Sequence, residues 1–156
     1  MREITDMKIV KVGIVGIGNM GGTHLACIMD GKIEGMTVRA VCDIDADKLH
    51  AAKEKYPMLE TYTDYKEMLT KADIDAAIIA VPHPLHAKIA IEAFEYGKHV
   101  LVEKPIDITV SAAEKLCAAA RKSGKVFAVM FNQRTNCVYR KMREIVHSGG
   151  IGELQR

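Results

Sequence analysis

Three glycines near the N-terminus have the spacing of a dinucleotide-binding loop. Gly16, Gly18 and Gly21 fit the pattern G-x-G-x-x-G and follow an apolar run that ends at Val15. In such a loop the first glycine permits a tight turn, the second lets the backbone approach a pyrophosphate, and the third lets a helix pack closely on a strand. We therefore expect phosphates at the N-terminus of that helix, bound by the loop residues Gly16, Ile17, Gly18, Asn19, Met20 and Gly21.

An acidic residue follows at the distance that such a unit requires. Asp43 lies 22 residues after Gly21, at the end of a second apolar run over residues 37–42. The acid at this place accepts hydrogen bonds from the ribose hydroxyls of the dinucleotide. The alternative role for Asp43 is to cap the helix that follows, but Asp45 can do this equally well. The complete glycine pattern favours the ribose role.

Two histidines follow the apolar run AAIIAV, which predicts a central strand. They lie in the segment AVPHPLH, which ends at His86. Ligands of open α/β sheets bind beyond the carboxyl ends of the strands, so Val81, Pro82, His83 and His86 are candidate cofactor-lining residues. The spacing H-x-x-H also suggests a metal pair, but no obvious third or fourth ligand accompanies it. We expect no metal, and the remaining alternative is a turn fixed by two prolines.

A lysine ends the next predicted strand. Glu103, Lys104 and Pro105 follow the apolar run that begins at His99, one strand further along the chain. A lysine in a cleft is charged, can polarise a hydroxyl or carbonyl group, and shifts its pKa when partly buried. The alternative is a surface ion pair between Glu103 and Lys104, which contributes little to stability. The place of Lys104 at a carboxyl strand end favours a role in chemistry.

Apolar runs and amphipathic stretches alternate along the chain and predict the elements that hold these residues. Such an α/β alternation with short links is typical of a Rossmann doubly wound parallel sheet with strand order 3-2-1-4-5-6, in a single domain. The predicted strands are residues 8–15, 37–43, 59–62, 75–81, 99–103 and 126–131. The predicted helices are residues 20–30, 45–56, 64–71, 84–96, 110–123 and 135–147.

The composition excludes several classes of function. The net charge is +2, aromatic residues make up 5%, and tryptophan is absent, so the chain has neither a basic patch nor a stacking platform for nucleic acid. Neither a membrane span nor a signal peptide is evident, which predicts a cytoplasmic protein with no membrane partner. The four cysteines form no C-x-x-C pair. We expect them to be reduced and mostly buried.

Taken together, these motifs resemble the Gfo/Idh/MocA oxidoreductases, the group of glucose-fructose oxidoreductase and inositol 2-dehydrogenase. The resemblance rests on GIVGIGNMG, on Asp43, on AVPHPLH, on GKHVLVEKP and on FNQR, and it extends over residues 8–154. It implies the nucleotide-binding domain of a NAD(P)-dependent oxidoreductase. Such an enzyme transfers a hydride between nicotinamide and a sugar, cyclitol or related polyol or ketone.

The resemblance also implies roles for single residues. Lys104 would lie beside the nicotinamide and the reacting carbon as a catalytic or substrate-orienting residue, and His86 is a weaker candidate for handling the proton. Glu103 and the residues around Pro82 and His86 would line the cofactor pocket, with Asn132 and Arg134 near it. His83 replaces the asparagine usual at its position. Ile44 follows Asp43 without an adjacent arginine, which favours NAD over NADP.

The domain limits follow from the same resemblance. We expect an N-terminal arm at residues 1–7, the NAD(P)-binding domain at 8–148, and at 149–156 the start of a C-terminal substrate and oligomerisation domain that the 156 residues do not include. The fragment alone is then expected to be inactive, and the full-length enzyme to be a homo-oligomer. Two alternatives stay open, a non-catalytic NAD-binding sensor module and an NAD-dependent glycosidase of the same family.

Overall fold

Six parallel strands form one sheet in the order β3-β2-β1-β4-β5-β6, as the sequence predicts. The computed structural model describes residues 9–153 and 155. The predicted arm at 1–7 and the predicted strand start at Lys8 lie outside these residues, as do positions 154 and 156 of the predicted C-terminal segment. The strands are β1 (Val10–Val15), β2 (Met36–Cys42), β3 (Glu60–Tyr62), β4 (Ala76–Ile79), β5 (His99–Glu103) and β6 (Phe127–Met130).

Helices cover both faces of this sheet because the central strands are apolar on both sides. In β1, Ile14 belongs to the apolar core beneath α1 and α2, whereas Val15 belongs to the core beneath α3, α4 and α5. The right-handed crossovers of a doubly wound fold produce this arrangement. The helices are α1 (Asn19–Met29), α2 (Ala46–Lys55), α3 (Tyr65–Lys71), α4 (His86–Glu95), α5 (Val110–Ser123) and α6 (Cys137–His147), with 3-10 turns η1 (His83–Leu85) and η2 (Asn132–Arg134).

Side-chain caps fix where several helices begin. The Asp45 carboxylate accepts from the backbone N–H groups of Asp47 and Lys48 at the start of α2. Thr109 caps α5 by accepting from the Ala112 N–H. At the other end of α5, Gly124 ends the helix in the left-handed conformation, with φ of 65°. Because Asp45 caps α2, the Asp43 carboxylate does not cap this helix.

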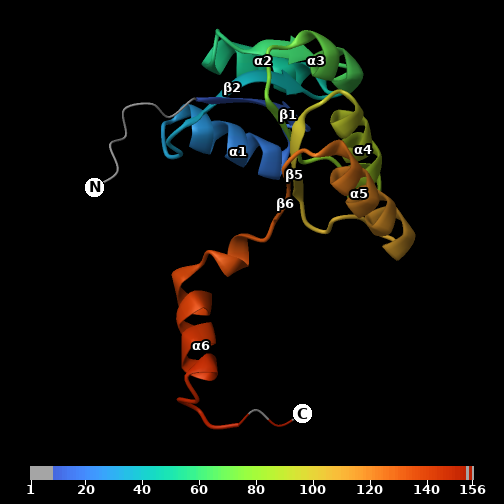
Figure 1. Ribbon diagram of the computed structural model, residues 1–156. Coiled ribbons are helices and arrows are strands. Elements are labelled where there is room, and N and C mark those ends of the chain that lie inside the picture. Colours follow the sequence, from blue (N-terminus) through green and yellow to red (C-terminus); the bar gives the residue numbers. More distant parts are fainter. Residues whose placement is uncertain (1–8, 154, 156) are drawn as a thin grey trace.

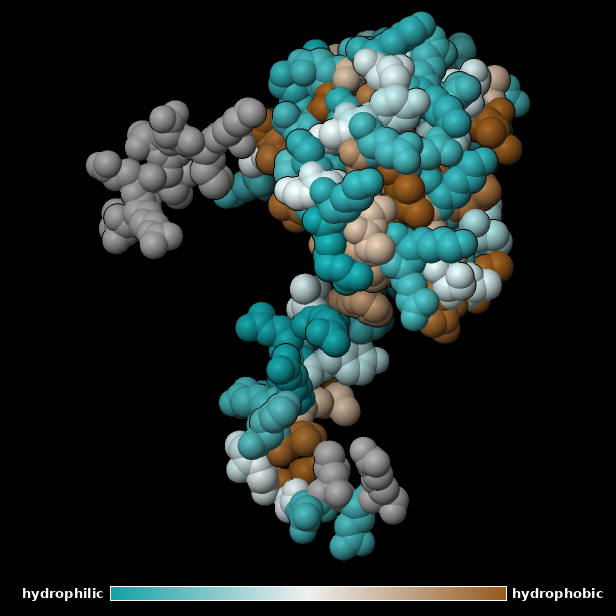
Figure 2. Space-filling model, turned by 45° about the vertical axis from the view of Figure 1, so that its right-hand side comes forward, coloured by the Kyte–Doolittle hydropathy of each residue, from teal (hydrophilic) through white to brown (hydrophobic). Residues whose placement is uncertain are grey.

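The helix α6 stands apart from the sheet and its covering helices (Figure 1). It carries no buried residue. Its apolar residues Val138, Tyr139, Met142 and Ile145 are exposed, and Figure 2 shows hydrophobic side chains at the surface of this lower segment. The part of the chain that is wrapped around the sheet therefore ends before η2.

The cysteines are free thiols, but the expectation that most of them are buried is wrong. Cys42 is buried, Cys27 and Cys117 are half-buried, and Cys137 is exposed. The exposure of Cys137 follows from its place at the start of α6, which packs on no face of the sheet. Among the described residues, no helix combines the length and apolar character that a membrane span requires.

Candidate cofactor site

A cavity of about 880 Å³ lies at the carboxyl edge of the sheet. It brings together residues at the carboxyl ends of β1, β2, β4 and β5 and the connections that follow these strands. This edge is where open parallel sheets bind their ligands. The lining residues include Gly16, Gly18, Met20, Cys42, Asp43, Ile44, Lys48, Thr63, Tyr65, Val81, Pro82, His83, Leu85, His86, Lys88, Ile89, Glu103, Lys104, Asn132 and Gln133.

The three glycines of the loop have three different steric roles. Gly16 has φ of +85°, and a Cβ there would lie 2.7 Å from the Ala80 carbonyl oxygen. Gly21 is buried, and a Cβ there would lie 1.8 Å from the Gly16 carbonyl oxygen. A Cβ on Gly18 would meet no protein atom within 4 Å, although Gly18 lines the cavity. The loop therefore needs Gly16 and Gly21 to form, and Gly18 leaves open space for a ligand.

The N-terminus of α1 faces this space without a side-chain cap among the described residues. The first N–H groups of a helix lack partners within it and carry partial positive charge. An uncapped N-terminus behind a glycine that leaves open space therefore fits a pyrophosphate. The loop and the helix would therefore bind a pyrophosphate through backbone N–H groups and not through a charged side chain.

Asp43 lies directly beside the loop. Its Oδ2 accepts from the Ile17 N–H at 2.8 Å, and its Oδ1 accepts from the Asp45 N–H at 3.0 Å. The carboxylate thus joins the end of β2 to the phosphate-binding loop, and each oxygen retains a lone pair for a ribose hydroxyl. Next to it, Ile44 is 94% exposed and lines the cavity, as an apolar surface suited to a flat ring.

Lys104 enters the cavity from the end of β5, and Glu103 beneath it is buried. The Oε1 atom of Glu103 lies 2.7 Å from the Nε2 atom of His24, and the Oε2 atom of Glu103 accepts a hydrogen bond from the Lys104 N–H at 3.2 Å. Glu103 therefore links α1, which starts at the phosphate-binding loop, to the backbone of Lys104. The Lys104–Pro105 peptide bond is cis.

Most of the predicted site residues meet in this cavity, but four of them do not line it. Ile17 is buried in the core, and Gly21 packs under Gly16. Asn19 begins α1. Arg134 lies 5.7 Å from the centre of the Phe131 ring. These four residues support the loop or flank it, whereas the cavity itself is lined by the other eleven: Gly16, Gly18, Met20, Asp43, Val81, Pro82, His83, His86, Glu103, Lys104 and Asn132.

Several lining residues were not predicted as site residues. Ile44 and Lys48 follow the β2 strand end, Tyr65 begins α3, and Gln133 lies in η2. The position of Ile44 directly after the site acid Asp43 is a usable signal for this residue. The others come from helices and turns whose orientation the sequence pattern does not fix.

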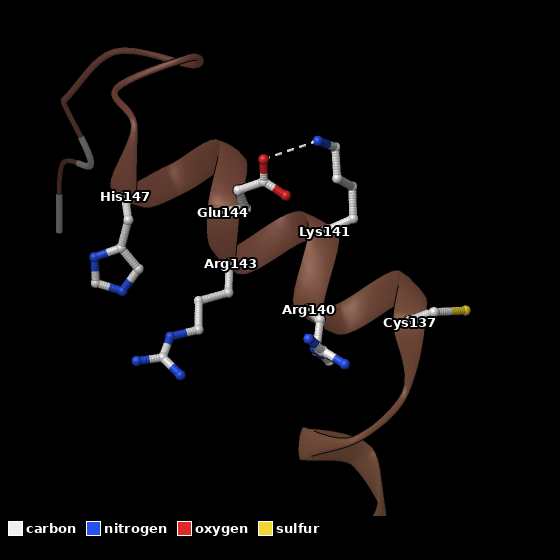
Figure 3. A pocket seen from close by; sticks show the side chains of 6 residues that line it. All are labelled: Cys137, Arg140, Lys141, Arg143, Glu144 and His147. Atoms are coloured by element: carbon white, nitrogen blue, oxygen red, sulfur yellow. Dashed lines mark hydrogen bonds and ion pairs between the residues drawn. The ribbon is translucent and has the colours of Figure 1, made fainter. Parts of the chain in front are cut away.

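A second hollow, of about 520 Å³, runs along α6. Its six lining residues, Cys137, Arg140, Lys141, Arg143, Glu144 and His147, all come from this one helix, and Figure 3 shows Lys141 and Glu144 paired while Arg143 and His147 point elsewhere. No second described element closes this hollow. We therefore place the functional site in the cavity at the sheet edge.

The cysteines at these two places should differ in reactivity. Burial, with the nearby carboxylates of Asp43 and Asp64, raises the pKa of the Cys42 thiol to about 12. We expect an aromatic disulfide reagent to modify the exposed Cys137 rapidly near neutral pH and to leave Cys42 as the unreactive thiol. Peptide mapping by mass spectrometry measures how far each cysteine is modified, and Cys137→Ser is the control that lacks the rapidly modified thiol. Equal modification of Cys42 in the folded protein would contradict this environment.

The strand order, the glycine turn after β1 and the acid after β2 define a Rossmann-type dinucleotide-binding domain. The chain belongs to the Gfo/Idh/MocA family. The family model described as oxidoreductase family, NAD-binding Rossmann fold, matches residues 10–131. This confirms the resemblance in the sequence, the fold class and the NAD-binding character of the domain.

Relatives and solved structures agree with this assignment. The inositol 2-dehydrogenase of Salmonella typhimurium is 34% identical over 92% of this chain and 43% of its own length. The α-N-acetylgalactosaminidase of Shewanella oneidensis is 32% identical over 95% of this chain and 34% of its own length. The scyllo-inositol dehydrogenase of Lactobacillus casei, solved with NAD(H) and scyllo-inositol, superposes with a TM-score of 0.88 at 32% identity over 94% of this chain and 43% of that one. The chain thus spans less than half the length of these relatives.

Proposed function

We propose that this domain works in an NAD-dependent dehydrogenase that moves a hydride between the cofactor and a carbon of a sugar, cyclitol or related polyol. The observation that carries the proposal is the position of Lys104 in the same cavity as the glycine loop and Asp43. A cofactor held by the loop and the acid extends along the carboxyl edge of the sheet toward the end of β5. The similar inositol dehydrogenases support the substrate class.

Different residues of this chain would bind the cofactor and stabilise charge on the substrate. The backbone of the loop from Gly16 to Gly21 binds the pyrophosphate, and Asp43 binds a ribose. Nicotinamide supplies the hydride chemistry, while the protein orients it and places charge. The Lys104 ammonium donates a hydrogen bond to the substrate oxygen and stabilises negative charge that develops there. Pro82, His83 and Asn132 form the walls around the reacting end.

An assay of NAD reduction tests this function. The complete enzyme that carries this domain is incubated with NAD and a panel of inositols, hexoses and sugar acids, and NADH is followed by absorbance. We expect steady reduction with at least one cyclic polyol. A lack of reduction with every member of the panel would contradict a polyol dehydrogenase.

A glycosidase is the second candidate, because the α-N-acetylgalactosaminidase is about as similar to this chain as the inositol dehydrogenases are. Such an enzyme would bind NAD without net consumption. Release of sugar from a glycoside with no accumulation of NADH distinguishes it from the dehydrogenase. A sensor module would show neither reaction.

The location and assembly are part of the proposal. We propose a cytoplasmic enzyme, supported by the four free cysteines among the described residues. We also propose that the complete protein is a homo-oligomer, as the family resemblance implies. Size-exclusion chromatography with light scattering measures the assembly, and a monomer at micromolar concentration would contradict it.

The Asp43 carboxylate gives a testable prediction for the cofactor. We expect Asp43→Asn to weaken NAD binding by about tenfold to a hundredfold and to reduce the preference over NADP, because a charge-assisted hydrogen bond is lost. Asp47→Asn is the matched control, since Asp47 is an exposed acid in the first turn of α2. Calorimetric titration measures the affinity for NAD and for NADP of the unmodified protein and of the two variants. Unchanged NAD affinity in the Asp43 variant would contradict the ribose role.

A further inference from the structure

A histidine in the second turn of α1 contacts the glutamate that precedes Lys104. The Nε2 atom of His24 lies 2.7 Å from the Oε1 atom of Glu103. The two side chains are only 14% and 10% exposed. Polar groups that are this far removed from water depend on each other for hydrogen bonding, because an unpaired one keeps its full desolvation cost. The contact therefore belongs to the interior of the domain and is not a surface ion pair.

The packing of α1 on the sheet brings His24 to this place. His24 follows Gly21 by three residues, on the same face of the helix, and the missing Cβ of Gly21 lets the helix lie close to the loop backbone. The apolar cluster beneath α1 includes Ile78 of β4, and Leu101 of β5 packs against it. The helix therefore extends from the loop after β1 toward β5, which is two strands away in the sheet.

The contact is a hydrogen bond whichever partner carries the proton. A neutral imidazole with its proton on Nε2 donates to a carboxylate, and an imidazolium does the same. A protonated carboxyl group would donate to an unprotonated Nε2 instead. A hydrogen bond between His24 and Glu103 therefore requires no particular charge on the ring.

The second carboxylate oxygen of Glu103 holds the backbone of Lys104. The strand β5 pairs with β6 as far as Glu103 and Met130, so Lys104 is the first residue beyond the sheet. Its N–H donates to the Oε2 atom of Glu103 at 3.2 Å. The Glu103 side chain thus restrains the chain for one residue more than the sheet does. His24 fixes the orientation of this side chain by binding its other oxygen.

We propose that His24 is a positioning residue for Lys104. It holds the Glu103 carboxylate, which holds the Lys104 backbone so that the ammonium group reaches the substrate oxygen. The proposal rests on the role of Lys104 in the proposed function. Within the described part of the chain, His24 is not one of the residues that line the cavity. It therefore acts through Glu103 and not by contact with the cofactor or substrate.

Exchange of the Lys104 amide tests this link without cofactor or substrate. The 156-residue chain is labelled with ¹⁵N, and exchange of the Lys104 N–H with solvent is measured by NMR in the unmodified chain, His24→Leu and His24→Gln. Leucine removes the hydrogen bond to Oε1, whereas the glutamine side chain retains an N–H donor. We expect exchange about threefold to tenfold faster in His24→Leu and unchanged in His24→Gln. Equal exchange rates in all three proteins would overturn the proposal.

Two further variants make this experiment specific. His50→Leu is the matched control, because the His50 side chain is 76% exposed on α2, and it should leave the exchange rate unchanged. Glu103→Gln takes the place of His24→Leu if that variant does not fold. Its amide presents one oxygen and one NH₂ group, so it cannot accept hydrogen bonds from both His24 and Lys104. Faster exchange of the Lys104 amide is expected again, and an unchanged rate would overturn the proposal.

A double-mutant cycle in the complete enzyme tests the consequence for chemistry. We expect His24→Leu to lower kcat by about tenfold and to change the Kd for NAD by less than about twofold, and His24→Gln to restore most of the lost kcat. His24→Leu should cause no further loss once Lys104→Met is present, because both changes act through the same group. Equal losses in both backgrounds would overturn the positioning role. An enzyme with no polyol activity would refute the proposed function, and the exchange rates would still decide whether His24 holds Lys104.

Discussion

In the proposed dehydrogenase, we expect replacement of Lys104 with methionine to lower kcat by about a hundredfold to a thousandfold, which is the usual cost of removing one donor that stabilises developing charge. Methionine retains most of the length and the apolar stem of the side chain but has no ammonium group. The Kd for NAD stays within about twofold, because the loop and Asp43 supply cofactor binding at the other end of the cavity. Stopped-flow or steady-state kinetics measure kcat, and calorimetry measures Kd.

Lys115→Met is the matched control for this experiment. Lys115 is exposed on α5 and does not line the cavity, so its replacement should leave both constants unchanged. A Lys104 variant with the kcat of the unmodified enzyme would remove Lys104 from the chemistry. The proposal would then have to place charge stabilisation on another residue.

We expect replacement of Gly21 with alanine to distort the loop, because the added Cβ would lie 1.8 Å from the Gly16 carbonyl oxygen. That atom belongs to the backbone, so the loop or α1 must shift. We expect a loss of at least about 2 kcal/mol in the free energy of unfolding, as in overpacked cores, and NAD binding too weak to detect. Thermal unfolding and calorimetric titration measure the two effects.

Two neighbouring glycines make this prediction specific. Gly22→Ala is the control, because its Cβ would meet its nearest atom, the Ile17 carbonyl oxygen, at an ordinary 3.5 Å, and alanine favours the helix. Gly18→Ala should retain the full stability of the fold and still weaken NAD binding, since its Cβ enters the space left for the pyrophosphate. A Gly21 variant that unfolds at the same temperature as the Gly22 variant would contradict the steric argument.

The strands were predictable from the sequence because parallel strands covered on both faces are continuous apolar runs. AAIIAV marked β4 and VFAVMF marked β6. Their ends were less predictable: residues 75–81 were expected, whereas β4 covers Ala76–Ile79. Hydrophobicity continues for a residue or two after the hydrogen-bond ladder stops, so it marks the presence of a strand better than its limits.

The first residues of the helices were harder to predict, because the hydrophobic pattern does not show where a preceding turn ends or which residue caps the helix. The helix expected over 84–96 divides into the turn η1 and α4, which begins at His86. The helix expected from Thr135 begins at Cys137, where Asn136 accepts from the Val138 N–H. Before α6, Asn132, Thr135 and Asn136 were all suitable caps, whereas α4 begins after η1 without a side-chain cap from the described residues.

The candidate site was predictable where its residues form motifs and unpredictable where it depends on long-range contacts. The glycine loop, Asp43 and Lys104 were found from spacing and strand position. The contact between His24 and Glu103 joins residues 79 positions apart, and no local pattern indicates it. Likewise, the sequence places His83 and His86 in one short segment, whereas the fold exposes the first and buries the second.

The loop and Asp43 are expected to bind NAD in this domain. Calorimetric titration of the 156-residue chain with NAD, and separately with NADP, tests it most directly. We predict saturable binding at one site, with NAD preferred and with the affinity reduced in Gly18→Ala at unchanged thermal stability. A folded chain that binds neither dinucleotide, or binds both equally in the unmodified and Gly18→Ala forms, would contradict it.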